Sequence, residues 1–173
     1  FYVDGGANTL SLVTPMGGTF SGGITKSGPG TLRLEGANTQ TGTITINEGT
    51  IRLAGSGTLG GAAALTIRQD GILELNGITP TNNTNAFINN GIVRNTHATS
   101  DVVFTVGGAN GTGDSRGIIE DGGAGKISVV KIGTGGQTLT GRTGDAAGGM
   151  PAVVGSVPTV VDGQVGGRHG GPL

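Results

Sequence analysis

The chain has 173 residues, the size of one domain, and 39 of them are glycine. Ten basic residues stand against 11 acidic ones with no Lys/Arg cluster, so no nucleic-acid partner is expected, because phosphate neutralisation needs a basic face. No apolar run approaches the roughly 20 residues of a membrane helix, so we expect no membrane insertion by this chain. The lack of cysteine excludes disulfides and thiolate metal sites.

Short runs that alternate apolar and polar residues recur along the chain, each bounded by Gly, Asn, Asp or Pro. Such runs are typical of short, half-buried strands. They occupy residues 9–12, 31–34, 43–46, 50–53, 65–68, 72–75, 102–106 and 126–130. Helix-forming residues are scarce, so the sequence predicts an all-β protein.

Two neighbouring segments repeat one another. TITINEGTIRLAG (43–55) aligns with ALTIRQDGILELNG (64–77), which places Gly71 22 residues after Gly49. A weaker copy, FINNGIVRN (87–95), places Gly91 20 residues after Gly71. A repeat of 20–22 residues with two or three short strands is typical of one solenoid turn. The sequence therefore predicts a parallel β-helix, with each strand paired to its equivalent one coil away.

This register assigns side chains to the inside, the corners and the outside of the coil. The predicted inward residues are Ile44, Ile46, Ile51, Leu53, Leu65, Ile67, Leu73 and Leu75. Glycine suits sharp corners, where positive φ or close backbone approach is needed. The predicted structural corners are Gly28, Gly30, Gly36, Gly42, Gly49, Gly55, Gly71, Gly77 and Gly91. An outward column of charges is predicted to set the register rather than bind a ligand: Arg33, Arg52, Glu74 and Arg94.

A longer repeat overlies the short one. Residues 22–42 are similar to residues 117–144, and with Lys26 set on Lys131, Gly28 meets Gly133. The spacing of 105 residues corresponds to roughly five coils.

Residues 20–60, FSGGITKSGPGTLRLEGANTQTGTITINEGTIRLAGSGTLG, resemble the passenger-associated transport repeat of autotransporter proteins. The shared pattern is G-x-I-x-K-x-G-x-G-T-L-x-L-x-G-x-N-T, followed by an aromatic where this chain has Gln40, a position we expect on the surface. A second copy covers residues 117–141, and the resemblance as a whole extends over about residues 9–141.

The resemblance implies a right-handed parallel β-helix in a secreted or cell-surface protein, without catalytic residues. We expect this β-helix over residues 1–141 and a Gly/Pro-rich tail over 142–173, either extended or disordered. Strand-like composition in the tail also suits an arm donated to a neighbouring subunit. The expected function is a non-catalytic, rigid stalk, not an enzyme, that associates end to end or with other passenger coils into a fibre, because open solenoid ends expose strand edges.

Two alternatives remain open. Glu35, Glu48, Asp70 and Glu74 fall near one another in the coil map, which leaves a polysaccharide-active or carbohydrate-binding β-helix possible. The other alternative is an adhesin passenger segment.

Residues 107–115, GGANGTGDS, faintly resemble the calcium-binding nonapeptide of β-rolls, with Asp101, Asp114 and Asp121 as candidate ligands. The motif occurs once, whereas neighbouring turns must share each ion, so a long corner loop is the preferred interpretation. We expect no metal and no cofactor.

Overall fold

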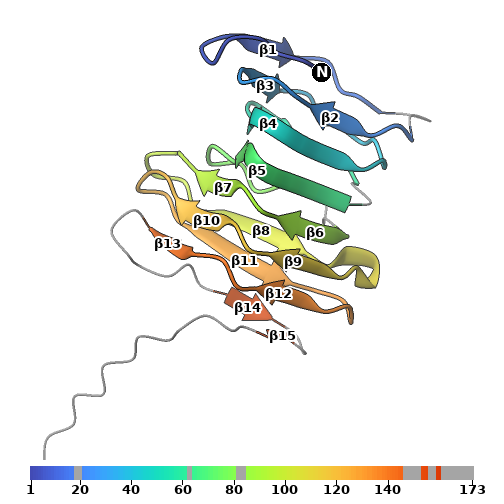
Figure 1. The fold of residues 1–173 in the computed structure, drawn as a ribbon, viewed down its shortest axis with the longest axis vertical. Helices are drawn as coiled ribbons and strands as arrows, with labels where there is room; N and C mark the ends of the chain where they lie inside the picture. Colours follow the sequence, from blue (N-terminus) through green and yellow to red (C-terminus); the bar gives the residue numbers. More distant parts are fainter. Residues whose placement is uncertain (18–20, 62–63, 81–84, 146–152, 156–158, 161–173) are drawn as a thin grey trace, which may run out of the picture.

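A computed structural model describes the chain except residues 18–20, 62–63, 81–84, 146–152, 156–158 and 161–173. The described part holds fifteen strands and one short 3₁₀ turn, η1 (Gly108–Asn110). Its strand pairs are parallel, and the strands stack in about six turns along the long axis (Figure 1). The predicted all-β solenoid is confirmed. The described residues include no helix with the length and apolar character of a membrane span.

Three faces run down the solenoid. Face A consists of β1 (Thr9–Leu12), β3 (Thr31–Leu34), the second halves of β4 (Ile44–Leu53) and β5 (Ala64–Glu74), then β7 (Ile92–Asn95), β10 (Ile118–Asp121) and β13 (Thr143–Asp145). Face B consists of β2 (Ile24–Lys26), the first halves of β4 and β5, β6 (Ala86–Asn89), β9 (Gly113–Ser115), β12 (Gln137–Leu139) and β15 (Thr159–Val160). Face C consists of β8 (Val102–Val106), β11 (Ile127–Lys131) and β14 (Val153–Gly155).

The core lies between the faces and follows the alternation of the strands. All eight residues predicted to point inward have no exposed surface: Ile44, Ile46, Ile51, Leu53, Leu65, Ile67, Leu73 and Leu75. Farther along, Phe87 of face B meets Phe104 of face C edge to face, with ring centroids 5.1 Å apart. An edge-to-face aromatic pair adds about 1 kcal/mol to the apolar burial, so it helps hold these two faces together.

Among the described residues, the first coils have no strand on face C, where β8 and β11 lie in later coils. There, side-chain amides form hydrogen bonds to the backbone of the neighbouring coil. Asn38 Oδ1 accepts from the Met16 amide at 2.8 Å, and Asn38 Nδ2 donates to the Thr58 carbonyl at 2.9 Å. Gln40 Nε2 donates to the Leu59 carbonyl at 3.0 Å. Gln40 has no exposed surface, so its expected place on the surface was wrong. Its amide takes over part of the coil-to-coil hydrogen bonding that a strand would supply.

Coil length varies more than predicted. Leu32 pairs with Ile51, 19 positions on, whereas Val93 pairs with Ile119, 26 positions on. Coils lengthen once face C gains strands of its own. Lys26 ends a strand of face B, but Lys131 ends a strand of face C. The two copies of the long repeat are therefore one face short of five turns apart, close to the roughly five coils expected from their spacing, but they lie on different faces.

Strand pairing continues past residue 141, where the sequence placed the end of the solenoid. β13 pairs with β10, β14 with β11 and β15 with β12, all parallel. Two pieces of the segment considered as an arm for a neighbouring subunit, Val153–Gly155 and Thr159–Val160, thus pair within their own chain. The rest of the expected tail lies outside the described residues.

Candidate functional site

The predicted charge column runs down the outside of face A. Register pairs Arg33 with Arg52, Arg52 with Glu74, and Glu74 with Arg94. Glu74 Oε2 lies 2.6 Å from Arg52 Nε, and Glu74 Oε1 lies 2.7 Å from Arg94 Nη2. The Glu74 side chain is only 6% exposed, because the two arginines cover it.

The ends of this column are balanced by neighbouring acids. Arg33 Nη1 lies 3.2 Å from Glu35 Oε1, which offsets its repulsion with Arg52. Glu120 follows Arg94 in register and lies 3.2 Å from Arg142. These groups neutralise one another, which suits a column that fixes strand register.

The nine predicted corner glycines fall into two kinds. Four have positive φ: Gly28, Gly49, Gly55 and Gly77. At the other five, an added Cβ would lie 2.2–2.6 Å from a neighbouring atom: Gly30, Gly36, Gly42, Gly71 and Gly91. One column of glycines follows the corner between faces B and A, and it continues beyond the predicted set through Gly117 and Gly141. Close stacking of backbone at this corner excludes any side chain.

Two buried lysines close similar corners. Lys26 has no exposed surface, and its Nζ donates to the carbonyls of Ser27 (2.9 Å), Gly28 (2.6 Å) and Glu48 (3.1 Å). Burial lowers the pKa of Lys26, and the Glu48 carboxylate acts in the opposite direction. Lys131, 3% exposed, donates to the carbonyls of Ile132 and Gly133. Both ammonium groups are used structurally, and neither lines either of the two pockets described below.

The acids considered for sugar chemistry are not gathered into one cluster. Glu48 and Asp70 are register partners at the corner, whereas Glu74 lies four positions farther along β5, between its arginines. Glu35 is paired with Arg33. The two groups of acids therefore lie about 13 Å apart along the strand, at the usual rise per residue.

The three aspartates considered for calcium are all engaged by other groups of the chain, and Asp101 and Asp121 share Lys126. Asp101 Oδ1 accepts from the Lys126 amide, and Asp121 Oδ1 accepts from the Ile127 amide, each at 2.7 Å. Asp114 pairs with Arg116 at 2.6 Å. In the described residues no three His, Cys, Asp or Glu side chains are grouped as a metal site would require. Residues 107–115 form a corner loop with η1 and then β9.

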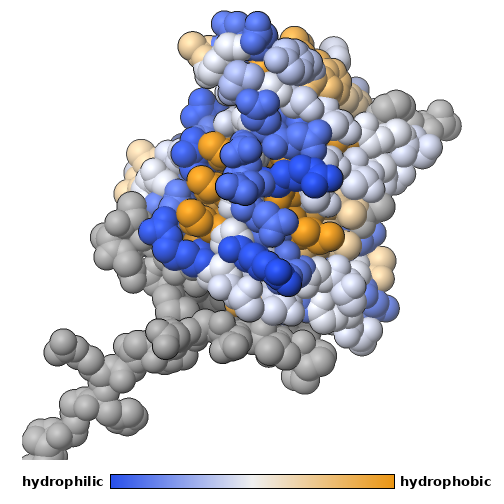
Figure 2. Space-filling view, in the orientation of Figure 1, coloured by the Kyte–Doolittle hydropathy of each residue, from blue (hydrophilic) through white to orange (hydrophobic). Residues whose placement is uncertain are grey.

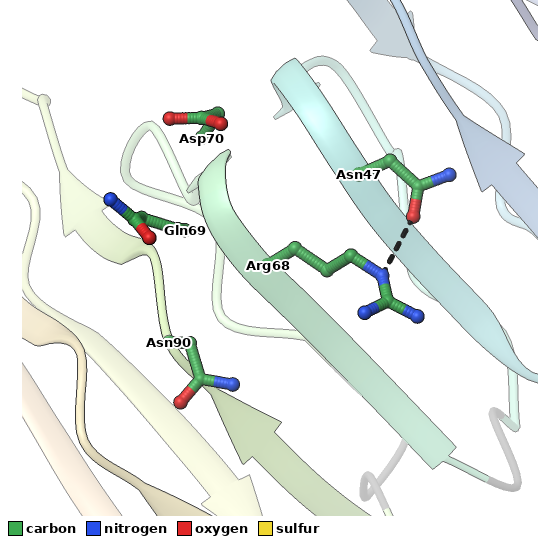
Figure 3. A pocket seen from close by; sticks show the side chains of 5 residues that line it. All are labelled: Asn47, Arg68, Gln69, Asp70 and Asn90. Atoms are coloured by element: carbon green, nitrogen blue, oxygen red, sulfur yellow. Dashed lines mark hydrogen bonds between the residues drawn. The ribbon is translucent and has the colours of Figure 1, made fainter.

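An open pocket of about 560 Å³ lies at the corner between faces B and A and was not anticipated from the sequence. Five polar side chains from three successive coils line it (Figure 3): Asn47, Arg68, Gln69, Asp70 and Asn90. Arg68 extends from β5 toward β4, where its Nε donates to Asn47 Oδ1 at 3.0 Å. In the space-filling view, strongly hydrophilic groups form a band with hydrophobic groups on either side (Figure 2).

This pocket arises from unequal corner lengths. Three residues (47–49) separate the face B and face A pairings in β4, and four (68–71) separate them in β5. Only two, Asn90 and Gly91, do so in the next coil. The register shift is a β-bulge, and it leaves Arg68, Gln69 and Asp70 exposed in a row, above the shorter corner. Once the register is known, the extra corner residue can be read in the sequence, because INEGT and IRQDGI differ by one residue before the next strand.

A second polar hollow of about 480 Å³ lies on face A near the first coils. It is lined by Thr9, Ser11, Thr31, Arg33, Arg52 and Asn76. Both of its arginines already have carboxylate partners, so the corner pocket offers the less neutralised charge.

Comparison with known proteins agrees with this architecture. No curated protein and no solved structure matches the chain. The family described as passenger-associated-transport-repeat matches residues 24–53, which span β2, β3 and β4 with the buried Lys26 corner and the start of the charge column. The chain thus carries a passenger-associated transport repeat at residues 24–53 of its β-solenoid.

Proposed function

We propose that this chain is a non-catalytic structural module, a rigid β-solenoid stalk in a secreted or cell-surface protein. The observation that carries the proposal is the passenger-associated transport repeat in the first coils. The same stacking of aliphatic side chains then continues through the later turns. A stalk needs continuous ladders and a core along its length. Parallel pairing links successive turns of the described solenoid, and one apolar cluster extends from Ile24 to Leu139.

A non-catalytic role is supported by the state of the acidic side chains. Glu35 and Glu74 are ion-paired with arginines. Asp121 is buried, and its Oδ1 accepts a hydrogen bond from the Ile127 amide. Glycoside hydrolysis uses two carboxyl groups about 5–10 Å apart across an open cleft. Glu48 and Asp70 are close in register, but only Asp70 lines the corner pocket.

We propose further that the module associates end to end through its first coil. Among the described residues, six large apolar side chains are exposed, and four of them belong to that coil: Phe1, Tyr2, Leu10 and Val13. Leu10 is the register partner of the fully buried Leu32, yet 40% of it is exposed, because in the described structure no coil lies above it. β1 is the terminal strand of its sheet, so one backbone edge is open to pairing.

The test is electron microscopy of the purified chain at neutral pH, together with light scattering across a concentration series. Filaments or concentration-dependent rods longer than one solenoid support the proposal. A monodisperse single rod at every concentration overturns the proposed end-to-end association but is consistent with the proposed stalk. Turnover of a polysaccharide by the purified chain would overturn the non-catalytic role.

A further inference from the structure

We propose that the corner pocket formed by Asn47, Arg68, Gln69, Asp70 and Asn90 binds an acidic saccharide, with a sugar carboxylate on the Arg68 guanidinium. The first step concerns the arginine. Every other arginine in the described part has a carboxylate within 3.2 Å: Arg33, Arg52, Arg94, Arg116 and Arg142. Arg68 has none, although Asp70 is two residues away.

The second step concerns how Arg68 is held. Its Nε donates to Asn47 Oδ1 at 3.0 Å, which fixes the side chain across two coils. The two terminal amino groups of the guanidinium have no partner among the described residues, and in Figure 3 they lie between β5 and β4 with no drawn side chain against them. A planar pair of N–H donors in a fixed position matches the two oxygens of a carboxylate.

The third step concerns the rest of the lining. The side chains of Gln69, Asp70 and Asn90 make no hydrogen bond or ion pair with the described residues and are exposed. Two amides and a carboxylate provide donors and acceptors for hydroxyl groups. The negative charge of Asp70 repels a dianion such as sulfate more strongly than the single carboxylate of a sugar acid. A ring with one carboxylate and several hydroxyls fits this combination best.

The pocket also has the right place and size for a segment of a longer chain. It is open to solvent at an outer corner, and its volume of about 560 Å³ lies within the range of small-molecule sites. Ile72 lies two residues after Asp70, and its register partner Ile92 lies two residues after Asn90. Both isoleucines are half-buried, so an apolar surface adjoins the polar one. A sugar ring presents both kinds of surface.

The experiment is calorimetric titration of the purified chain with a short oligogalacturonate, a neutral oligosaccharide of the same length, sodium acetate and sodium sulfate. We expect binding of the oligogalacturonate, with affinity about tenfold weaker in Arg68→Gln, the loss typical of one charge-assisted hydrogen-bond pair. Asn90→Ala should weaken it less. Arg116→Gln is the matched control, since Arg116 is exposed at the corresponding corner of a later coil but is paired with Asp114, and it should bind like the unaltered chain.

Circular dichroism and thermal melting of each variant establish that the fold is retained. Equal binding by the unaltered chain and by Arg68→Gln would overturn the assignment. Binding of acetate or sulfate as tight as that of the oligogalacturonate would reduce the site to a general anion site and overturn the saccharide. No binding of the oligogalacturonate at millimolar concentration would overturn the proposal altogether.

Discussion

Lys26 and Lys131 occupy the same position in two corners that lie 105 residues apart and on different faces of the solenoid. Each Nζ donates to the carbonyl of the next residue and to that of the glycine after it, Gly28 or Gly133. Both glycines have positive φ, +77° and +70°. The corner is therefore a local unit made by the K-x-G sequence, and it works at the end of a face B or a face C strand alike.

Replacing Lys26 with Met should destabilise the fold by about 2 kcal/mol, because three backbone carbonyls lose their buried donor. Lys131→Met should act in the same direction through the carbonyls of Ile132 and Gly133. Urea unfolding followed by circular dichroism measures both. Unchanged midpoints for both variants would show that these carbonyls find other partners and would refute the role given to the lysines.

The Lys26 contribution should also depend on pH. Burial lowers the pKa of Lys26 below its ordinary value of 10.5, with Glu48 partly opposing the shift. In the window just below 10.5 the unfolded chain binds the proton more tightly than the folded one. The unfolding free energy from this group therefore rises as the pH rises through the window. The difference in unfolding free energy between the unaltered chain and Lys26→Met should grow toward pH 10.5, and a shrinking difference would contradict the shift.

Much of the first five turns could be predicted because inward aliphatic residues alternate regularly there. Leu32, Ile51 and Leu73 recur at matching places, so both the strands and the Arg–Glu column follow from counting. β9 and β12 were missed, since Gly113, Ser115 and Gln137 take inward positions and Leu139 is the one inward aliphatic residue of the two strands. The alternation that marks a strand is lost when polar groups point into the core.

The corner pocket was missed for a different reason. Corner residues carry no periodic signal, and the pocket depends on differences of one or two residues between adjacent corners. These differences in corner length reveal a pocket only when the register of all three coils is known. Gln40 was misplaced similarly, because its burial depends on the Leu59 carbonyl of the next coil.

Glu74→Gln should lower stability by about 1–2 kcal/mol, because Arg52 and Arg94 would share a position without a countercharge. The estimate is moderate, since the two arginine side chains are 42% and 32% exposed and water screens them. Glu120→Gln is the control: its partner Arg142 is 67% exposed, and the loss should be below about 0.5 kcal/mol. Thermal melting at low and high salt tests both, and equal losses would show that burial of Glu74 has no energetic consequence.

Gly49→Ala should be among the most damaging single changes, costing about 3 kcal/mol or more. The residue has a φ of +70°, and a Cβ would lie 2.4 Å from the Gly28 carbonyl oxygen and 2.5 Å from that of Gly30. Gly6→Ala is the matched control, because an added Cβ there meets nothing within 4 Å. Urea unfolding of the two variants should separate them clearly, and similar midpoints would argue against a tightly stacked corner.

Val13→Asp should reduce end-to-end association of the purified chain. Val13 is 63% exposed just after β1, and burying a carboxylate at that end would leave it without a partner. Val103→Asp introduces the same charge on the side of the solenoid, at an exposed position of β8, and should leave association unchanged. Sedimentation velocity over a concentration series distinguishes the two variants. If Val103→Asp disrupts association and Val13→Asp does not, the contact lies along the side of the rod, and the first coil is not the interface.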